Sequence, residues 1–496
     1  MNDPNGLFFL DGWYHLFYQY STVGPAYRPI SWGHAVSRDL LRWRHLPVAI
    51  RRSARDWAYS GNAIVDHDNR SGLAKGRRPA CLAFFTNSRG SRTPAQHQTV
   101  DLAYSRDGGW RWRRYHGNPV ADPGRRVFDA PFVFEFPPDR SFRMLVGERL
   151  TPPSGPPGRF SVYRSADLLR WERVGQIGPF GSRTEIWEVP VLVKVPVRGR
   201  ARERHWVLLW SIVDRTRGGW TSTRYLVGGF DGHGFRALRA GDTGRTLDYG
   251  ADVYAPLVWS HAPGPPTLIA WMSSWSYARR IPPRSYTGGP LTLVRQLALE
   301  RTPRGLELVQ IPHPALRKLR RRPLRFGPLR LRDERRPVPL PSAAAQSFEL
   351  LLSWRGDARR FGVRLRVGPH EFTEVGIDAA GEYLYLDRRR SGRVRFADHF
   401  PTVLRAPLPP ATARVALHLF VDRSSVEVFA ARGRRVLTAQ IYPDPRSLGL
   451  EVFAAGGEAR LDGLRLWPLR SIWPEPTQGR RSPSRTRAVR RRRRML

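Results

Sequence analysis

The chain of 496 residues has little of several residue types that carry particular functions. Cys81 is its only cysteine, which excludes a disulfide within the chain and a metal site built from several thiolates. No run of 18 apolar residues occurs, so we expect no membrane span. No basic segment followed by an apolar one opens the chain, as a secretory leader would. These features leave the cellular location open.

Lysine is nearly absent, although the formal net charge is +41. Only Lys75, Lys194 and Lys318 stand among 83 basic residues, so nearly all the positive charge belongs to arginine. A basic chain can bind nucleic acid, but that activity usually gathers its charge on one face or in a known motif. These arginines are spread along the whole chain. Compositional pressure on the genome explains them equally well, and we expect no nucleic-acid partner.

Helical periodicity is also scarce, and short alternating runs rich in aromatic and β-branched residues take its place. This pattern predicts an all-β protein. A turn motif recurs after such runs, in "SRDLLRW", "SRDGGW", "SADLLRW" and "GGFDGHGF". Its aspartates, Asp39, Asp107, Asp167 and Asp231, are 60 to 68 residues apart. One more period ends near residue 310, which predicts a five-bladed β-propeller over residues 1–315. Coincidence among Asp-containing turns is the alternative.

The composition changes after the propeller region. Residues 316–344 are rich in Pro and Arg and are expected to form a linker. Residues 345–469 alternate cleanly between apolar and polar positions, which predicts a C-terminal β-sandwich. Residues 470–496 are basic and lack an apolar pattern, so a disordered tail is expected.

Several motifs occur in a family-specific order: "MNDPNG", "HLFYQY", "WGHAVSRDLLRW", "YSGNAIVD", "WEVP", "YGADVYAP", "IAWMSSW" and "DRSSVEVFA". In this series the chain resembles glycoside hydrolase family 32, the invertases, levanases, inulinases and fructan exohydrolases. The resemblance covers roughly residues 1–468. It implies a five-bladed propeller with three carboxylates in a central funnel, and a retaining exo-β-fructosidase acting on sucrose, levan or inulin. Retention requires two carboxyl groups about 5–5.5 Å apart, one nucleophilic and one acidic.

The resemblance assigns the two principal carboxylates. Asp3 of "NDPNG" matches the nucleophile, and Pro4 and Gly6 would fix its turn. Glu188 of "EIWEVP" matches the general acid/base. Glu185 is the rival for this role, but residues three apart in a strand point to opposite faces.

The third carboxylate is less clearly placed, because "VFDAPF" departs from the family's Arg-Asp-Pro. Aligned on Pro131 without a gap, Asp129 takes the arginine position and Ala130 the aspartate position. With one extra residue, Asp129 keeps the aspartate role and the arginine is lost. A shift by one residue turns a strand side chain to the other face, although a bulge can restore its direction. We favour Asp129 as the third catalytic carboxylate.

The resemblance also implies a set of substrate contacts, for each of which core or turn packing is the alternative role. These residues are Asn2, Gln19, Tyr27, Tyr59, Ser60, Asp252 and Trp271. The expected partner is a fructose-containing oligosaccharide or polysaccharide. Because two carboxylates and water suffice, we expect neither a metal nor an organic cofactor. The oligomeric state is left open.

Two alternatives share the same scaffold. A fructosyltransferase differs only in whether a sugar or water reaches the fructosyl-enzyme, which depends on loop geometry that the sequence hides. A catalytically impaired fructan-binding homologue is favoured by the altered Arg-Asp-Pro motif. Fructan polymers lie outside cells, so an extracellular location fits the substrate, yet the chain opens without a signal peptide.

Overall fold

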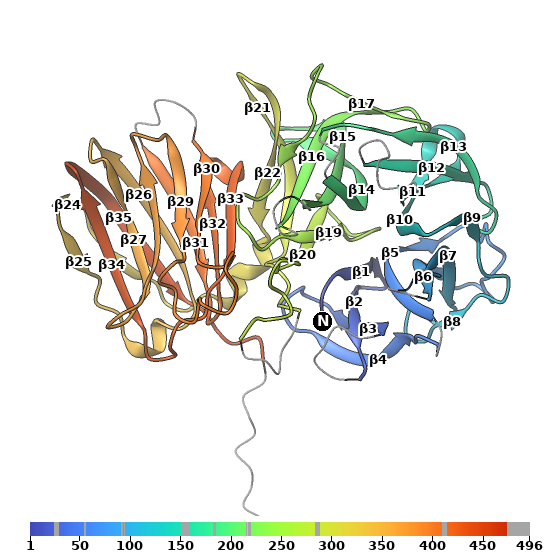
Figure 1. Cartoon of the computed structure of the whole chain (residues 1–496), viewed down its shortest axis with the longest axis horizontal. Coiled ribbons are helices and arrows are strands. Elements are labelled where there is room, and N and C mark those ends of the chain that lie inside the picture. The colour runs from blue at the N-terminus through green and yellow to red at the C-terminus, as the bar shows by residue number, and fades with distance from the viewer. Residues whose placement is uncertain are drawn as a thin grey trace, which may run out of the picture.

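A computed structural model of the chain is all-β, with a few short 3-10 helices (Figure 1). It describes residues 1–473 apart from 24–28, 54–55, 91–92, 94, 150–157, 182–184, 215, 217–219, 283–287 and 409–413. The tail expected from residue 470 therefore falls almost wholly outside the described residues. The described 3-10 helices are η1 (Pro137–Asp139), η3 (Pro314–Leu319), η4 (Ser342–Ala344) and η5 (Ala431–Gly433). None of the helical segments in this described part has the length and apolar character that a membrane crossing requires.

Antiparallel sheets that follow one another along the chain form the N-terminal half, residues 1–312. The first sheet contains β1 (Pro4–Leu10), β2 (Trp13–Ser21), β3 (Ile30–Ser37) and β4 (Arg44–Ile50). The second contains β5 (Asp56–Asp66), β6 (Ala80–Arg89), β7 (His97–Ser105), β8 (Arg113–Arg114) and β9 (Ala121–Arg125). The third contains β10 (Val127–Phe136), β11 (Ser141–Arg149), β12 (Arg159–Ser165) and β13 (Glu172–Ile177).

The remaining strands of this half form one nine-stranded sheet made of two groups. The first group contains β14 (Glu185–Val197), β15 (Arg200–Asp214), β16 (Trp220–Phe230), β17 (Phe235–Ala237) and β18 (Arg245–Thr246). The second contains β19 (Tyr254–Val258), β20 (Thr267–Trp271), β21 (Arg295–Thr302) and β22 (Gly305–Pro312). A single parallel pair, Val197 with Leu299, joins β14 to β21.

The first strands of these groups contact one another in a closed order: β1 with β5, β5 with β10, β10 with β14, β14 with β19, and β19 with β1. Figure 1 shows them gathered toward the middle of the N-terminal half. Neighbouring sheets share apolar cores, such as Phe17 and Trp32 packed with Phe85 between the first two sheets. Side chains on the first strands therefore converge from different sheets, although the strands are far apart in the sequence.

The recurring Asp motif forms the turn between the third and fourth strands of a group. Between β3 and β4, Asp39 Oδ1 accepts hydrogen bonds from the backbone N–H groups of Leu41 and Arg42. Asp107 and Asp167 accept equivalent bonds in their own turns. A carboxylate that satisfies two free N–H groups fixes a tight turn, which explains why the motif repeats.

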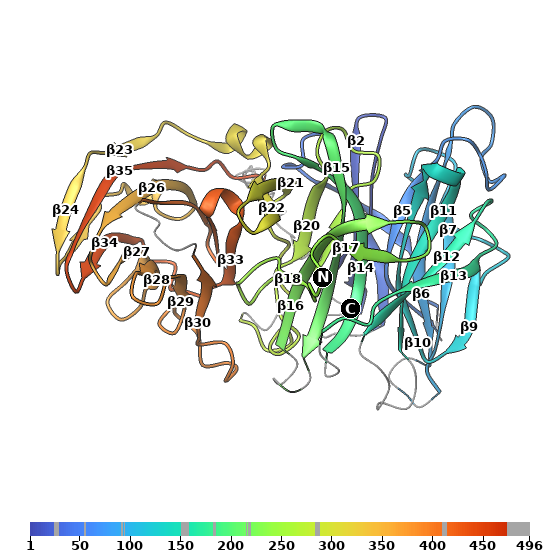
Figure 2. The same ribbon diagram turned by 90° about the horizontal axis from the view of Figure 1, so that it is seen from above.

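Two facing sheets form the C-terminal half, residues 314–473, and Figure 2 shows them as two layers. One contains β23 (Leu324–Phe326), β24 (Leu329–Arg332), β26 (Phe348–Gly356), β31 (Val415–Val421), β32 (Ser425–Ala430), β33 (Arg435–Gln440) and β35 (Glu458–Pro468). The other contains β25 (Arg335–Pro337), β27 (Arg360–Val367), β28 (Thr373–Asp378), β29 (Tyr383–Asp387), β30 (Val403–Pro407) and β34 (Gly449–Ala455). Their alternating apolar side chains meet in one core between the layers.

The segment 316–344, expected as a linker, is instead part of these sheets. Strands β23 and β24 pair with β35, and β25 pairs with β34. Leu331 is fully buried, and Phe326 packs against the same core. The outward arginines at alternate positions gave this stretch the composition of a linker, although its apolar residues keep a strand period.

Candidate active site

The N-terminal turn places Asp3 in a buried, hydrogen-bonded position. Asp3 is 4% exposed, and its backbone oxygen accepts a hydrogen bond of 3.0 Å from the Gln19 backbone N–H. The Asn2 N–H donates to the Gln19 carbonyl at 3.2 Å. Strand β2 therefore holds this turn on both sides. Gly6 has φ +53°, and a Cβ there would lie 2.7 Å from two aromatic rings, so the bend after Pro4 requires glycine.

Three side chains donate hydrogen bonds to the Asp3 carboxylate. Asn2 Nδ2 lies 3.0 Å from Oδ1, whereas Ser60 Oγ and Gln19 Nε2 lie 2.8 and 3.3 Å from Oδ2. Burial, with a smaller contribution from the charge of Glu188, raises the pKa of Asp3 to about 6, against the hydrogen bonds from Asn2 and Ser60. The carboxylate is thus fixed in orientation and sensitive to the charge of Glu188.

Glu188 lies on β14 immediately before a bulge. Register shifts there, because Val189 and Pro190 stand opposite a single residue of β15, and Val189 has φ +51°. The hydroxyl of Tyr254 donates a hydrogen bond to Glu188 Oε2. Glu185, its rival in sequence, forms an ion pair of 2.8 Å with Arg224 and does not line the cavity described below.

Asp129 occupies the same position on β10 that Glu188 occupies on β14. It too precedes a bulge of two residues, and Ala130 has φ +54°. The Ala130 N–H donates to Thr86 Oγ1 of the second sheet at 2.8 Å. Opposite Asp129 stands Gly147, where an added Cβ would lie 2.7 Å from the carboxylate. The bulge that the sequence left open is therefore present.

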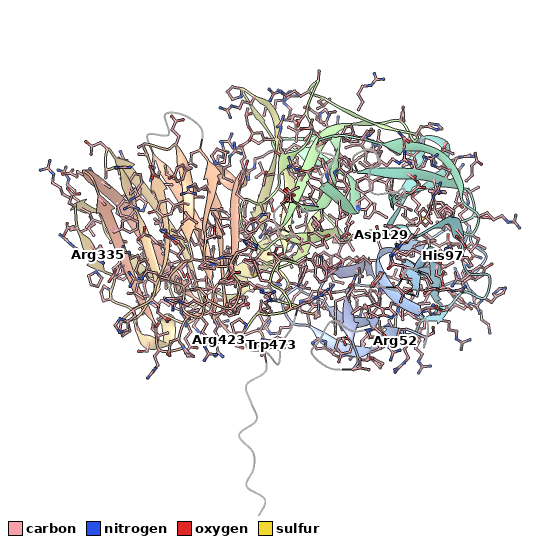
Figure 3. The ribbon with its side chains drawn as sticks, viewed as in Figure 1. Arg52, His97, Asp129, Arg335, Arg423 and Trp473 are labelled. Atoms are coloured by element: carbon pink, nitrogen blue, oxygen red, sulfur yellow. The ribbon has the colours of Figure 1, made fainter. Side chains whose placement is uncertain are left out.

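A cavity of about 320 Å³ brings these carboxylates together. Asp3, Asp129 and Glu188 all line it, Asp3 from the turn before β1, Asp129 from β10 and Glu188 from β14. Figure 3 labels Asp129 toward the middle of the N-terminal half. Of the predicted substrate contacts, Gln19, Tyr59 and Ser60 line the cavity too. Asn2 acts through its hydrogen bonds to Asp3 and to Gln19 Oε1, the latter 2.7 Å long.

Other predicted contacts lie elsewhere. Asp252 is fully buried outside the cavity, with its Oδ2 2.6 Å from Arg388 Nη1 of the C-terminal half. Trp271 is fully buried behind Tyr254 and donates its ring N–H to the Gly288 carbonyl. We therefore withdraw both as sugar contacts, because neither side chain reaches the space that a sugar would occupy. Tyr27 lies outside the described residues.

Sequence reasoning missed several residues of the site. Tyr254 binds Glu188, and the cavity is also lined by Trp275, Arg279, Gln96 and Gln98. A sequence signal for Tyr254 did exist. A triplet with Ala or Val before Pro occurs at the first-strand bulge in "DAP", "EVP" and "YAP", whose first residues are Asp129, Glu188 and Tyr254. Within the described residues, no cluster of His, Cys, Asp and Glu could hold a metal ion.

Comparison with known proteins decides the family. The family model described as "Glycosyl hydrolases family 32 N-terminal domain" matches residues 1–312, and the model described as "Glycosyl hydrolases family 32 C terminal" matches residues 315–468. The chain belongs to glycosyl hydrolase family 32. The resemblance drawn from the motifs is thereby confirmed, and the protein is a glycoside hydrolase by family.

Relatives of the family 32 chain include bacterial and fungal enzymes. A levanase of Bacillus subtilis (strain 168) is 35% identical over 484 residues, which cover 95% of this chain and 69% of the levanase. An extracellular exo-inulinase of Aspergillus awamori is 31% identical over 506 residues, covering 95% of this chain and 93% of the inulinase. The crystal structure of exo-inulinase from Aspergillus awamori superposes with a TM-score of 0.85 at 30% identity, covering 95% and 96% of the two chains.

Proposed function

We propose that the protein is a retaining exo-β-fructosidase that releases terminal β-D-fructofuranosyl units from sucrose, levan or inulin. The observation that carries the proposal is one cavity lined by Asp3, Asp129 and Glu188. Levanase and exo-inulinase activities among the relatives support the substrate class. A cavity of about 320 Å³ lies at the small end of ligand sites, which suits one terminal sugar better than a threaded chain.

In this proposal Asp3 attacks the anomeric carbon while Glu188 protonates the departing oxygen. The products of that step are a fructosyl ester on Asp3 and the shortened saccharide. Glu188 then takes a proton from water, which attacks the ester and releases fructose with retained configuration. Asp129 would accept hydrogen bonds from the fructose hydroxyls and stabilise positive charge on the ring. The chemistry needs no group that these side chains lack.

The geometry around Asp3 supports the nucleophilic role. A nucleophile must keep one orientation through both steps, and the donors Asn2, Gln19 and Ser60 fix both carboxylate oxygens. Only 4% of Asp3 is exposed, so little of it contacts bulk solvent. At the position before Asp129 this chain has Phe128, whose side chain is buried in the core.

We also propose that the N-terminal half is a five-bladed β-propeller and the C-terminal half a β-sandwich, meeting near residues 313–320. The closed order of contacts among β1, β5, β10, β14 and β19 supports five blades. So does the bulge at the equivalent position of each of these strands. On this view the nine-stranded sheet is two blades joined through one residue pair.

The test is fructose release from sucrose, inulin and levan by the wild type, Asp3→Asn and Glu188→Gln. We expect each substitution to reduce kcat by about 10³-fold or more. Glu185→Gln is the matched control, because Glu185 is on the same strand and is bound to Arg224 outside the cavity. It should retain near wild-type kcat.

The outcomes separate the alternatives. Longer oligomers formed from concentrated sucrose would make the protein a fructosyltransferase. Fructan binding without fructose release would make it a binding homologue. Full activity of Asp3→Asn would remove the proposed mechanism.

A further inference from the structure

The junction between the two halves contains a fully buried ion pair that the proposed chemistry does not use. Arg388, which directly follows β29, lies with its Nη1 2.6 Å from Asp252 Oδ2, and both side chains are 0% exposed. Arg388 Nη2 also donates to the Tyr277 hydroxyl at 3.1 Å, and that hydroxyl donates to Asp252 Oδ1 at 2.5 Å. The Gln440 N–H donates to Asp252 Oδ2 at 2.8 Å. The C-terminal half therefore holds both oxygens of Asp252, directly or through Tyr277.

Backbone contacts fix the same segment against β33. The Tyr249 N–H donates to the Val436 carbonyl at 2.8 Å, and the Asp252 N–H donates to the Thr438 carbonyl at 3.3 Å. Between them, Gly250 lies so close that a Cβ would be 2.0 Å from the Thr438 oxygen. Residues 249–252 thus lie along a strand of the other half, and only a residue without a side chain fits at position 250.

This segment leads directly into the active site. Asp252 is two residues before Tyr254, the first residue of β19, whose hydroxyl donates to Glu188 Oε2. Tyr254 is 1% exposed, and the rings of Trp271 and Trp275 pack against it. With its ring enclosed, the position of its hydroxyl follows from the position of its backbone. Whatever fixes Asp252 therefore constrains where the carboxyl group of Glu188 receives its hydrogen bond.

We infer that Arg388 is a positioning residue for Glu188, acting from the C-terminal half through Asp252 and Tyr254. The inference rests on the proposed function, in which Glu188 is the general acid/base. Removing one partner of a buried ion pair leaves an uncompensated charge, so the segment would shift or take up water instead of keeping its place. A shift of about 1 Å in a catalytic group is enough to slow a reaction substantially. The C-terminal half thus contributes to acid catalysis in addition to stability.

The experiment compares two substrates that differ in their need for an acid. Sucrose has a poor leaving group that requires protonation by Glu188, whereas fluoride leaves β-D-fructofuranosyl fluoride with little protonation. The ratio kcat/KM reports the fructosylation step for both substrates. For Arg388→Met and Arg388→Lys we expect kcat/KM on sucrose to fall by about 10–100-fold, within the range of general acid catalysis. On the fluoride, kcat/KM should change by less than about threefold, since Asp3 is untouched.

Glu300→Gln is the matched control at the same junction. Glu300, on β21, lies with Oε1 3.3 Å from Arg432 Nη1 and Oε2 3.5 Å from Arg434 Nε of the C-terminal half, and none of these residues belongs to the segment that leads to Tyr254. Its loss should lower stability without changing the ratio of the two substrates. Asp252→Asn, which keeps the size of the side chain, provides a second variant on the route should Arg388→Met fail to fold.

Equal losses on both substrates for Arg388→Lys and Asp252→Asn would overturn the inference, because a general structural disturbance affects both. Unchanged kinetics would overturn it as well. A wild type that cleaves neither substrate would instead refute the proposed function, which the wild-type assay alone decides.

Discussion

Asp3 should make the stability of the wild type fall as pH rises, opposite to the usual effect of a carboxylate, and replacement of Asp3 by asparagine should remove this dependence. Asp3 is buried, and burial raises its pKa from 3.8 to about 6, with a smaller contribution from the charge of Glu188. Between these two pH values the folded state binds more protons than the unfolded state. The wild type therefore loses stability as pH rises through this window, and the loss is complete above about pH 6.

The magnitude follows from the shift. A difference of about 2 pKa units corresponds to about 3 kcal/mol of unfolding free energy at 1.36 kcal/mol per unit. An asparagine side chain does not titrate, so the Asp3→Asn variant escapes this cost. The unfolding free energy of Asp3→Asn minus that of the wild type should thus increase by about 2 kcal/mol between pH 4 and pH 7, because part of the full difference develops below pH 4. Asparagine makes weaker hydrogen bonds at this position, which changes the unfolding free energy by the same amount at every pH and leaves its pH dependence unchanged.

Urea unfolding followed by tryptophan fluorescence at several pH values provides the measurement. Asp39→Asn is the control, since Asp39 is a turn carboxylate whose N–H donors outweigh its burial and lower its pKa. Its difference from the wild type should stay level between pH 5 and 8. A level difference for Asp3→Asn as well, or one that decreases with pH, would refute the argument that burial dominates at Asp3.

Three further predictions follow from the same contacts. Activity on sucrose should fall about tenfold per pH unit below about pH 6 as Asp3 becomes protonated, and Ser60→Ala should move this acidic limb of the pH profile to higher pH because it removes a donor to the carboxylate. If Ser60→Ala leaves the acidic limb in place, Asp3 is not the group responsible. Tyr254→Phe should lower kcat about tenfold with little change in KM, measured by fructose release, because only the hydroxyl bound to the general acid is lost; an unchanged kcat would contradict this role. Gly6→Ala should reduce the unfolding free energy by about 2 kcal/mol or more, whereas Gly12→Ala should reduce it by only about 1 kcal/mol, because both glycines have positive φ but only Gly6 has ring atoms 2.7 Å from the added Cβ. Equal losses of unfolding free energy in urea would show that steric crowding at Gly6 contributes nothing.

The sequence alone was sufficient for the features that depend on neighbouring residues. Alternation of apolar and polar side chains predicted an all-β chain, and the structure confirms it. The aspartates of the recurring motif could be found because each one binds N–H groups two to four residues away. The order of motifs identified the family. Asp3 and Glu188 could be singled out for the same reason, as members of short, characteristic segments.

The prediction failed where arginine fills the outward positions of short strands. Residues 316–344 contain strands, yet their high content of Arg and Pro resembled a linker. What distinguishes the two is whether Leu331 and its neighbours find an apolar partner, and that partner, β35, lies more than 120 residues further along the chain.

The tertiary structure decided which residues of a recognised motif face the site. In "YGADVYAP" the sequence pointed to the carboxylate of Asp252, but Arg388 neutralises that charge at the junction, and the neutral Tyr254 binds Glu188. At Asp129, only the bulge determines on which side of the strand the carboxylate lies. Sequence spacing determines local periodicity and turns, because those depend on residues a few positions apart. The direction of a side chain at a bulge and the partner of a buried charge depend on strands that meet only after folding. Only the folded chain therefore determined these two features.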